Sequence, residues 1–397
     1  MEAYLDNAAT TRAYDEVCDI VMEAMKTNYG NPSSLHTKGV DAEKYIRYAK
    51  DVFAGILKVE PKEIYFTSGG TESNNTALAG AAAANMRRGK HIISTAIEHA
   101  SIYNPLIELE HQGYEVTWLP VDEKGMVSLD ALKSALREDT ILVSVMCVNN
   151  EIGTIEPLDE IGKIIKDYNK DILFHVDAIQ GFGKLRIYPR KLNIDLLSIS
   201  GHKLHGPKGT GVLYIKDKVK VRPLILGGGQ QKDMRSGTEN VPGIAGIAKA
   251  AEITYTDLET KIAHLYALRS DFIGKIKQMD GVVVNGFEDC VDMGFSKGCA
   301  SHVVSVSFEK IRAEVLLHAL EEKGVYVSSG SACSSNHPAI SGTLKAIGVD
   351  KKYLDATIRF SFSLETTQEE LDYCISCLET LVPVLRRYTP EEEDNEV

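Results

Sequence analysis

Short apolar runs alternate with segments of helical period over most of the chain before residue 258. Residues 140–146, 172–176 and 196–199 are mostly apolar at successive positions, which indicates strands buried on both faces. Strands separated by helices favour a parallel sheet that is covered on both sides. Further strands are expected at 63–67, 91–95 and 113–118, and helices at 71–85 and 101–112.

The pattern changes after residue 258, where a long amphipathic segment is followed by shorter elements. We expect a smaller α+β unit there, with helices at 261–279, 311–323 and 367–387 and strands at 302–308, 325–327 and 357–361. The predicted division is a large domain at 14–257, a small domain formed by 1–13 and 258–388, and an acidic tail at 389–397 with too little to bury to fold.

Composition narrows the class of protein. A chain of 397 residues is too long for one ordinary core, and its net charge of -12 disfavours nonspecific binding to nucleic acid or anionic membrane. The N-terminus shows no signal segment and no apolar run is long enough to cross a bilayer, so we expect a cytoplasmic protein. The 7 cysteines lack the spacing of a disulfide scaffold, which fits a reducing compartment.

The segment Ser68-Gly-Gly-Thr-Glu-Ser73 stands between a predicted strand and a predicted helix. Glycine lets the backbone approach a ligand, and a helix N-terminus presents free N–H groups to an anion. A phosphate site around Gly70 and Thr71 is one interpretation. An ordinary turn between a strand and a helix is the other.

Two further polar residues follow buried strands, where open parallel sheets bind ligands. Asp177 could keep a pyridine nitrogen protonated, or it could simply cap the next turn. Lys203, after Ser198-Ile-Ser200-Gly-His202, could form a Schiff base if it is desolvated, or it could be a solvated surface lysine. The order of phosphate loop, acid and lysine along the chain favours one cofactor site over three unrelated features.

With these motifs the sequence closely resembles the class V aminotransferase branch of the fold-type I pyridoxal-phosphate enzymes. More narrowly, it resembles the cysteine desulfurases of the nitrogen-fixation and iron–sulfur-cluster type. The resemblance implies an α/β fold with a mostly parallel central sheet, helices on both faces and a smaller α+β domain. The matching segments are Tyr4-Leu-Asp-Asn-Ala-Ala-Thr-Thr11, Gly30-Asn-Pro-Ser-Ser34, Val148-Asn-Asn-Glu-Ile-Gly153, Arg235-Ser-Gly-Thr-Glu-Asn240 and Ser328-Ser-Gly-Ser-Ala-Cys333.

The resemblance also implies a role for each matching position. Lys203 is expected to hold pyridoxal 5'-phosphate as a Schiff base, and Asp177 to pair with its pyridine nitrogen. Arg359 is expected to grip the substrate carboxylate, since a guanidinium fork pairs with both oxygens; otherwise it is an exposed cross-strand charge. The other expected contacts are Gln180 and Asn150 near the ring hydroxyl, with Asn150 also near the substrate, and Gly70, Thr71, Ser200 and His202 at the phosphate.

Two more positions receive roles from the resemblance alone. His99 is expected to stack on the cofactor ring and to carry protons, although a satisfied histidine after a strand is the plainer interpretation. Thr238 is expected to reach the phosphate of a neighbouring subunit, which implies a homodimer.

Cys333 decides the expected reaction. It lies among small polar residues that are typical of a loop, and a nucleophilic thiol must be accessible and partly ionised. The resemblance implies that its thiolate attacks the sulfur of bound L-cysteine, keeps that sulfur as a persulfide and leaves alanine. The alternative is a free surface cysteine. No metal site is expected, because Cys374-Ile-Ser-Cys377 lies in a helical pattern without a second ligand pair.

We therefore predict a cysteine desulfurase that passes sulfur to an acceptor protein, either a cluster scaffold or a thiolation enzyme. A selenocysteine lyase or a class V aminotransferase is the alternative within the same family. The alternative from a different class is a catalytically idle partner in a sulfur-transfer complex, against which an intact set of Lys203, Asp177 and Cys333 argues.

Overall fold

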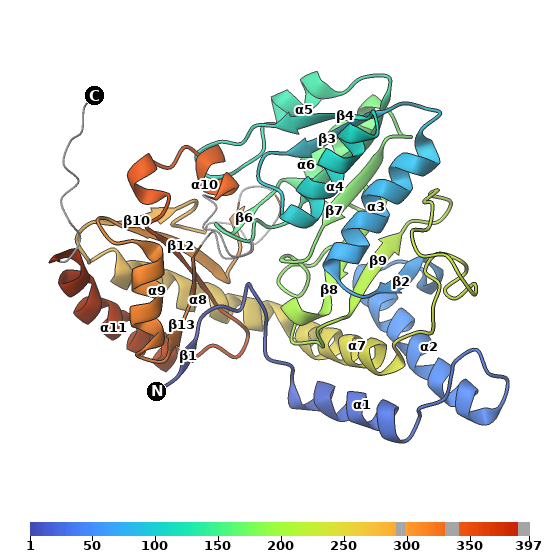
Figure 1. Cartoon of the computed structure of the whole chain (residues 1–397), viewed down its shortest axis with the longest axis horizontal. Helices are drawn as coiled ribbons and strands as arrows, with labels where there is room; N and C mark the ends of the chain where they lie inside the picture. Colours follow the sequence, from blue (N-terminus) through green and yellow to red (C-terminus); the bar gives the residue numbers. More distant parts are fainter. Residues whose placement is uncertain (291–294, 296–297, 330–340, 388–397) are drawn as a thin grey trace.

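The structure is a computed structural model that describes residues 1–290, 295, 298–329 and 341–387. Its largest sheet has seven strands and lies to the right in Figure 1. The order across this sheet is β2-β9-β8-β7-β5-β3-β4. The strands are β2 (Ile64–Thr67), β3 (His91–Thr95), β4 (Glu115–Leu119), β5 (Thr140–Met146), β7 (Leu173–Asp177), β8 (Leu196–Ser200) and β9 (Gly211–Ile215).

Helices cover both faces of this sheet, which explains why its central strands carry apolar residues at successive positions. On one face, Leu78 and Leu106 belong to the same buried cluster as Leu142. On the other face, Phe53 and Ile161 pack in the main core. The first face is covered by α3 (Gly70–Asn85) and α4 (Ala100–His111). The second face is covered by α2 (Thr37–Leu57), α5 (Leu129–Ala135), α6 (Leu158–Tyr168) and α7 (Val241–Tyr255). A further helix, α1 (Asp15–Lys26), packs against α7.

The expectation of a mostly parallel central sheet is confirmed, with one strand running the other way. β9 pairs antiparallel with both β2 and β8, and the sequence did not predict it. β9 begins at Gly211, where an added Cβ would lie 2.6 Å from Thr67 Oγ1 and 2.7 Å from Gly69 Cα. Glycine therefore lets β9 pass close beside the turn that opens α3.

A second sheet of four antiparallel strands lies to the left in Figure 1, in the order β10-β12-β15-β14. Phe272 packs its ring at steep angles, 54° and 76°, against Phe360 and Phe362 in the core beside it. This is the α+β arrangement expected after residue 258, while the proposed domain limits stay a prediction. Its elements are β10 (Val282–Asn285), β12 (Val303–Phe308), β14 (Ser328–Ser329), β15 (Thr357–Ser361), α8 (Leu258–Ile276), α9 (Ala313–Glu321), α10 (Gly342–Ala346) and α11 (Gln368–Arg387).

The N-terminal segment connects the two sheets. β1 (Ala3–Tyr4) pairs in parallel with β13 (Val325–Tyr326), so the strand predicted at 325–327 joins the N-terminus and not the four-stranded sheet. Past β1, Ser361 N donates to Leu5 O at 2.7 Å, and Thr11 N donates to His202 O at 2.8 Å. The first residues of the chain thus run from the last strand of the small sheet to the turn that carries Lys203.

A disulfide joins Cys290 to Cys299, whose Cα atoms lie 5.6 Å apart. Cys299 belongs to β11 (Gly298–Cys299), which pairs antiparallel with β6 (Thr154–Ile155). The sequence shows no disulfide scaffold and does not single out this pair. The physical reason is that a separation of nine residues carries no disulfide signal by itself, whereas the Cα distance lies in the range that such bonds require.

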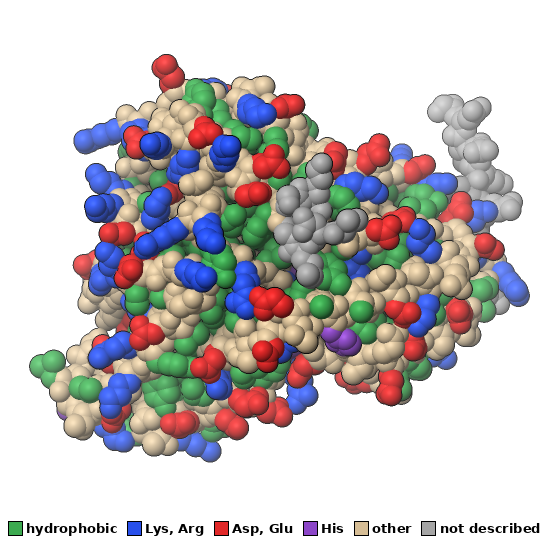
Figure 2. Space-filling model, turned by 180° about the vertical axis from the view of Figure 1, so that it is seen from behind, with side chains coloured by type: hydrophobic (Ala, Val, Ile, Leu, Met, Phe, Trp, Pro, Cys, Tyr) green, Lys and Arg blue, Asp and Glu red, His purple; other side chains and the backbone are tan. Residues whose placement is uncertain are grey.

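None of the described helices is long and apolar enough to cross a membrane. Figure 2 shows acidic and basic side chains interspersed over the face that it presents. The field over this face is therefore of mixed sign, although the whole chain carries a net charge of -12.

Candidate active site

The carboxyl ends of β5, β7 and β8 open into a pocket of about 220 Å³. A cavity of this size suits a small molecule, and its place at the strand ends is where open α/β sheets bind ligands. The residues that line it are Ala8, Gly70, Thr71, His99, Ser101, Met146, Val148, Asn150, Asp177, Ile179, Gln180, Ser200, His202, Lys203 and Arg359.

The pocket brings together nearly all the site residues expected from the sequence. Thr238 is exposed and is not among the lining residues. Cys333 lies outside the residues that the structure describes. The expected residues that line the pocket are Gly70, Thr71, His99, Asn150, Asp177, Gln180, Ser200, His202, Lys203 and Arg359.

Asp177 is the last residue of β7 and lies in the buried floor of the pocket. Its Oδ1 accepts from Ile179 N at 2.9 Å, and its Oδ2 accepts from Asn74 Nδ2 at 2.8 Å. Burial raises the pKa of Asp177, although these hydrogen bonds and the charges of His99 and Lys203 act against it. A fixed carboxylate with a raised pKa holds a proton well when that proton is shared with a ring nitrogen.

Lys203 follows β8 in a short 3-10 turn, Gly201–Lys203. Its Nζ donates to Ala8 O at 2.6 Å and to Ala9 O at 2.7 Å. Both carbonyls belong to the N-terminal segment, so the amine is held between that segment and the strand ends. An amine in this position can reach a carbonyl group in the pocket.

His99 caps the N-terminus of α4. Its Nδ1 accepts from Ser101 N at 3.1 Å and lies 2.8 Å from Ser101 Oγ. Burial lowers the pKa of His99, which favours the neutral ring at pH 7. Because Nδ1 accepts a hydrogen bond, the neutral ring carries its proton on Nε2. The imidazole is thus fixed in one tautomer beside Asp177 and Lys203.

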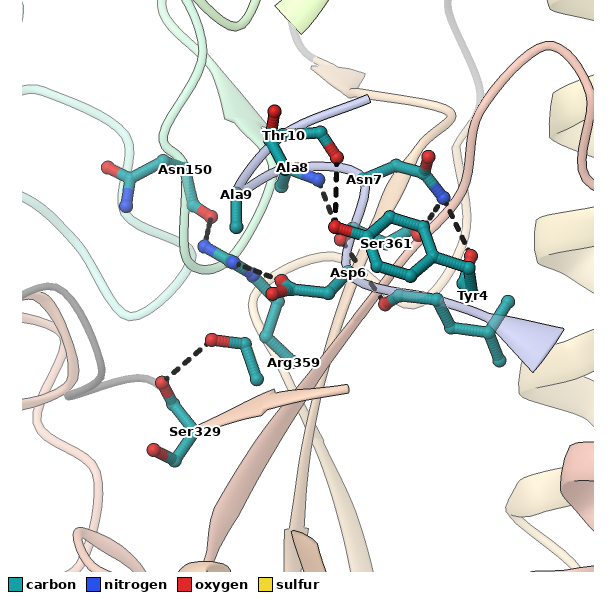
Figure 3. A network of polar contacts seen from close by, with 12 residues as sticks. Tyr4, Asp6, Asn7, Ala8, Ala9, Thr10, Asn150, Ser329, Arg359 and Ser361 are labelled. Carbon is teal, nitrogen blue, oxygen red and sulfur yellow. Dashed lines mark hydrogen bonds and ion pairs between the residues drawn. The ribbon is translucent and has the colours of Figure 1, made fainter. Parts of the chain in front are cut away.

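Arg359 lies in β15 and is 3% exposed. Figure 3 shows its guanidinium between the N-terminal segment and Asn150. Nη1 donates to Asn150 O at 2.9 Å, and Nη2 forms an ion pair with Asp6 Oδ1 at 2.8 Å. Its Nε is buried without a hydrogen-bond partner among the described residues, and the two contacts above use only two of the five N–H donors of the guanidinium, so donors remain for a ligand. The interpretation of Arg359 as an exposed cross-strand charge is therefore wrong.

Gln180 is oriented from both ends of its amide. Nε2 donates to Ala8 O at 2.9 Å, and Oε1 lies 3.3 Å from His302 Nε2. Burial, followed by several nearby positive charges, holds the pKa of His302 well below its usual range. The ring is therefore neutral, and its Nε2–H is the donor to Gln180.

Gly70, Thr71, Ser200 and His202 form the end of the pocket that suits a phosphate. Gly70 begins α3, and an added Cβ there would lie 2.2 Å from Ile179 Cδ1, so glycine keeps this end open. The first turn of a long helix supplies free N–H groups, and the hydroxyls and imidazole add donors. Burial and the charges of nearby lysines lower the pKa of His202 to about 4.

These observations fit pyridoxal phosphate. An amine, a buried carboxylate and an anion cradle lie in one pocket, and the remaining N–H donors of Arg359 match a substrate carboxylate. Several supporting residues are not predicted by the sequence: Asp6 on Arg359, Asn74 on Asp177, Ser101 on His99 and His302 on Gln180. Asp6 belongs to the matching segment Tyr4–Thr11, but that segment does not reveal its partner.

Comparison with known proteins gives the class. The chain belongs to the family described as aminotransferase class-V, which matches residues 3–374. It is 44% identical over 387 residues to the protein named "Cysteine desulfurase IscS" from Methanosarcina thermophila, covering 98% of this chain and 93% of that protein. The resemblance drawn from the sequence motifs is thereby confirmed.

Solved structures agree with this likeness. A NifS-like protein is 38% identical with a TM-score of 0.90, covering 97% of this chain and 100% of that one. The structure of SspA in complex with cysteine is 33% identical with a TM-score of 0.79, covering 92% of this chain and 100% of that one.

Proposed function

We propose that the protein is a pyridoxal-phosphate-dependent cysteine desulfurase. It converts L-cysteine into L-alanine and retains the sulfur as a persulfide on Cys333. The observation that carries the proposal is the single pocket in which Lys203, Asp177 and Arg359 meet. The names of the relatives narrow the reaction to cysteine.

The residues around the pocket divide between the parts of the cofactor. Lys203 would bind its aldehyde, Asp177 would pair with its ring nitrogen, and the cradle at Gly70, Thr71, Ser200 and His202 would hold its phosphate. When bound, pyridoxal phosphate supplies an electron sink that weakens the bonds at the α-carbon of the substrate. Gln180, held by Ala8 O and His302, supplies an amide of fixed orientation beside the ring.

Arg359 and Asn150 orient the substrate. Arg359 is buried, and its Nη1 already fixes the backbone of Asn150, so the guanidinium cannot swing away from the pocket. A carboxylate that enters beside it gains a charge-assisted hydrogen bond from a guanidinium that is itself buried. This contact selects an α-amino acid and sets which bond at its α-carbon faces His99 and Lys203.

His99 and Lys203 move the proton. With pyridoxal phosphate bound, the Lys203 amine would serve as the base for the proton at the α-carbon of the substrate. His99 carries its proton on Nε2, held there by the hydrogen bond that Nδ1 accepts from Ser101 N. It can therefore donate to a neighbouring atom while its ring stays in place.

Cys333 is assigned the sulfur step partly because the described cysteines are unsuited to it. Burial raises the pKa of both Cys147 and Cys374, so their thiols stay protonated. Cys290 and Cys299 are joined to each other. None of the described cysteines lines the pocket.

The wider assembly is also part of the proposal. We infer a homodimer in which the exposed Thr238 reaches the phosphate held by the neighbouring subunit. The persulfide is passed to an acceptor protein, which is a cluster scaffold or a thiolation enzyme.

The test follows alanine formation, persulfide formation and amino transfer to a keto acid in the holoprotein supplied with L-cysteine. Wild type should release alanine and gain persulfide, and Cys333→Ala should keep its cofactor while losing both activities. Cys18→Ala, which removes an exposed thiol on α1, is the matched control and should behave as wild type. Undiminished alanine formation by Cys333→Ala would favour a lyase or an aminotransferase. Cofactor-loaded wild type that never gains persulfide would favour an idle partner.

A further inference from the structure

A second lysine lies directly behind the turn that carries Lys203. Lys184 is 7% exposed, and its Nζ donates to the backbone carbonyl of Lys203 at 2.9 Å. The hydroxyl of Tyr255 fixes the backbone on both sides of Lys184. Gly183 N donates to Tyr255 Oη at 3.1 Å, and Tyr255 Oη donates to Leu185 O at 3.0 Å. Lys184 therefore reaches the Lys203 turn from a backbone that cannot easily shift.

The surroundings of Lys184 are positive. Burial, followed by the charge of Lys203, lowers the pKa of Lys184 to about 8, and no carboxylate is among the described groups that shift it. The other charged or titratable groups in this region are His205, which lies 3.7 Å from Glu365, His302, Arg269, Arg359 and Asp177. The charge of Lys184 contributes to the lowered pKa of both histidines. Both histidines are therefore neutral, and Lys184 is the ammonium next to Lys203 at pH 7.

We propose that Lys184 is a positioning residue for Lys203: it anchors the Lys203 turn through its carbonyl and sets a second positive charge beside the Lys203 amine. This rests on the proposed function, in which Lys203 binds the cofactor. An amine must be uncharged to attack a carbonyl, and a neighbouring cation in a desolvated site favours the uncharged form. Ala8 O and Ala9 O act the other way, because they accept from Nζ and stabilise the ammonium. The carboxylate of Asp177 acts in the same direction as these carbonyls, because its interaction with the Lys203 charge is attractive.

The first test measures the pH midpoint of the absorbance change of the bound cofactor in the holoprotein without substrate. Lys184→Met removes the nearby charge and should raise this midpoint by about one pH unit. Lys184→Arg keeps the charge and should stay near wild type. Lys163→Met, an exposed lysine on α6, is the matched control and should not move the midpoint. An unchanged midpoint in Lys184→Met, or equal shifts in Lys184→Met and Lys184→Arg, would overturn the proposal.

A second test keeps Lys184, removes the charge of Lys203 and measures the titration of Lys184. Coupling between two charges is reciprocal, so removing the Lys203 charge must affect Lys184 equally. In the cofactor-free Lys203→Met protein, the pH midpoint of the NMR signal of the Lys184 ε-carbon should rise by about one pH unit over cofactor-free wild type. An unchanged midpoint contradicts the proposal even where a Lys184 variant does not fold.

Borohydride reduction fixes the cofactor to the lysine that binds it, and peptide mapping then identifies that lysine. This result distinguishes failure of the role of Lys184 from failure of the proposed function. Cofactor fixed to Lys203 with no response to Lys184→Met defeats only the role of Lys184. Cofactor fixed to any other lysine defeats the proposed function itself.

Discussion

Arg359 holds Asp6 in an ion pair of 2.8 Å, although the two residues stand 353 positions apart. Two and three residues after Asp6, Ala8 O and Ala9 O accept from Lys203 Nζ. The N-terminal segment therefore contacts both the group proposed to bind the substrate carboxylate and the amine proposed to bind the cofactor. Its position decides how far apart these two groups lie.

Arg359→Lys keeps the positive charge and removes the planar fork. We expect the KM for L-cysteine to rise by about 30-fold, with a smaller fall in kcat, because an ammonium pairs with a carboxylate less specifically. Steady-state alanine formation measures both constants. Arg312→Lys, which changes an exposed arginine before α9, is the control and should leave both unaltered. An unchanged KM in Arg359→Lys would remove this residue from the substrate site.

Asp177→Asn replaces the buried carboxylate with a neutral amide of the same shape. The cofactor should still attach to Lys203, but kcat should fall by about 100-fold or more, because the amide cannot hold a proton on the ring nitrogen. Absorbance gives the cofactor content and alanine release gives the rate. Asp167→Asn, on the exposed side of α6, is the control. Turnover near that of wild type would contradict the pairing of Asp177 with the ring.

Glu98 predicts a pH dependence of stability. Its Oε1 accepts from Thr95 Oγ1 at 2.7 Å and from Met146 N at 2.9 Å. Burial raises its pKa from 4.5 to about 8, so between these values the folded protein binds more protons than the unfolded chain. The free energy of unfolding must therefore fall as pH rises from 4.5 to 8.

Glu98→Gln should remove this part of the pH dependence, because the amide stays neutral. Urea unfolding of the holoproteins should give similar stabilities at a pH of about 5, and a variant more stable than wild type by roughly 4 kcal/mol at a pH of about 8. Glu123→Gln, at an exposed position, should follow wild type at both values. Parallel stability curves for wild type and Glu98→Gln would show that Glu98 is ionised in the folded protein.

The Cys290–Cys299 bond predicts a thiol count. Protein unfolded without reductant should titrate two fewer thiols than protein unfolded after reduction, out of the 7 cysteines in the sequence. In Cys290→Ser the reduced and unreduced counts should agree, whereas Cys18→Ser should keep the difference of two. Equal counts in the wild type, prepared under air, would mean that the two thiols meet without forming the bond.

Many of the strands and helices could be predicted from the sequence because they depend on local patterns of apolar and polar residues. β3, β5 and β12 lie where apolar runs stand, and α3 follows the glycine pair that opens it. Asp177 and Lys203 could be placed in one site since each comes directly after a buried strand, and such strand ends share one edge of the sheet.

The partners of these residues could not be predicted in the same way. Asn74 and Asp177 are 103 positions apart, and Gln180 and His302 are 122 apart, so their contacts depend on how distant elements pack. β9 was missed because its direction is set by its neighbours and not by its own pattern. Cys333 and the acidic tail lie outside the described residues, so their proposed roles stay predictions. The cytoplasmic location also stays a prediction.

The central claim is tested most directly by locating the transferred sulfur. The holoprotein should be incubated with L-cysteine, alkylated without reductant, digested and analysed by mass spectrometry. The peptide that contains Cys333 should carry one additional sulfur atom, and the peptide that contains Cys18 should carry none. An unmodified Cys333 peptide in protein that has released alanine would contradict the claim.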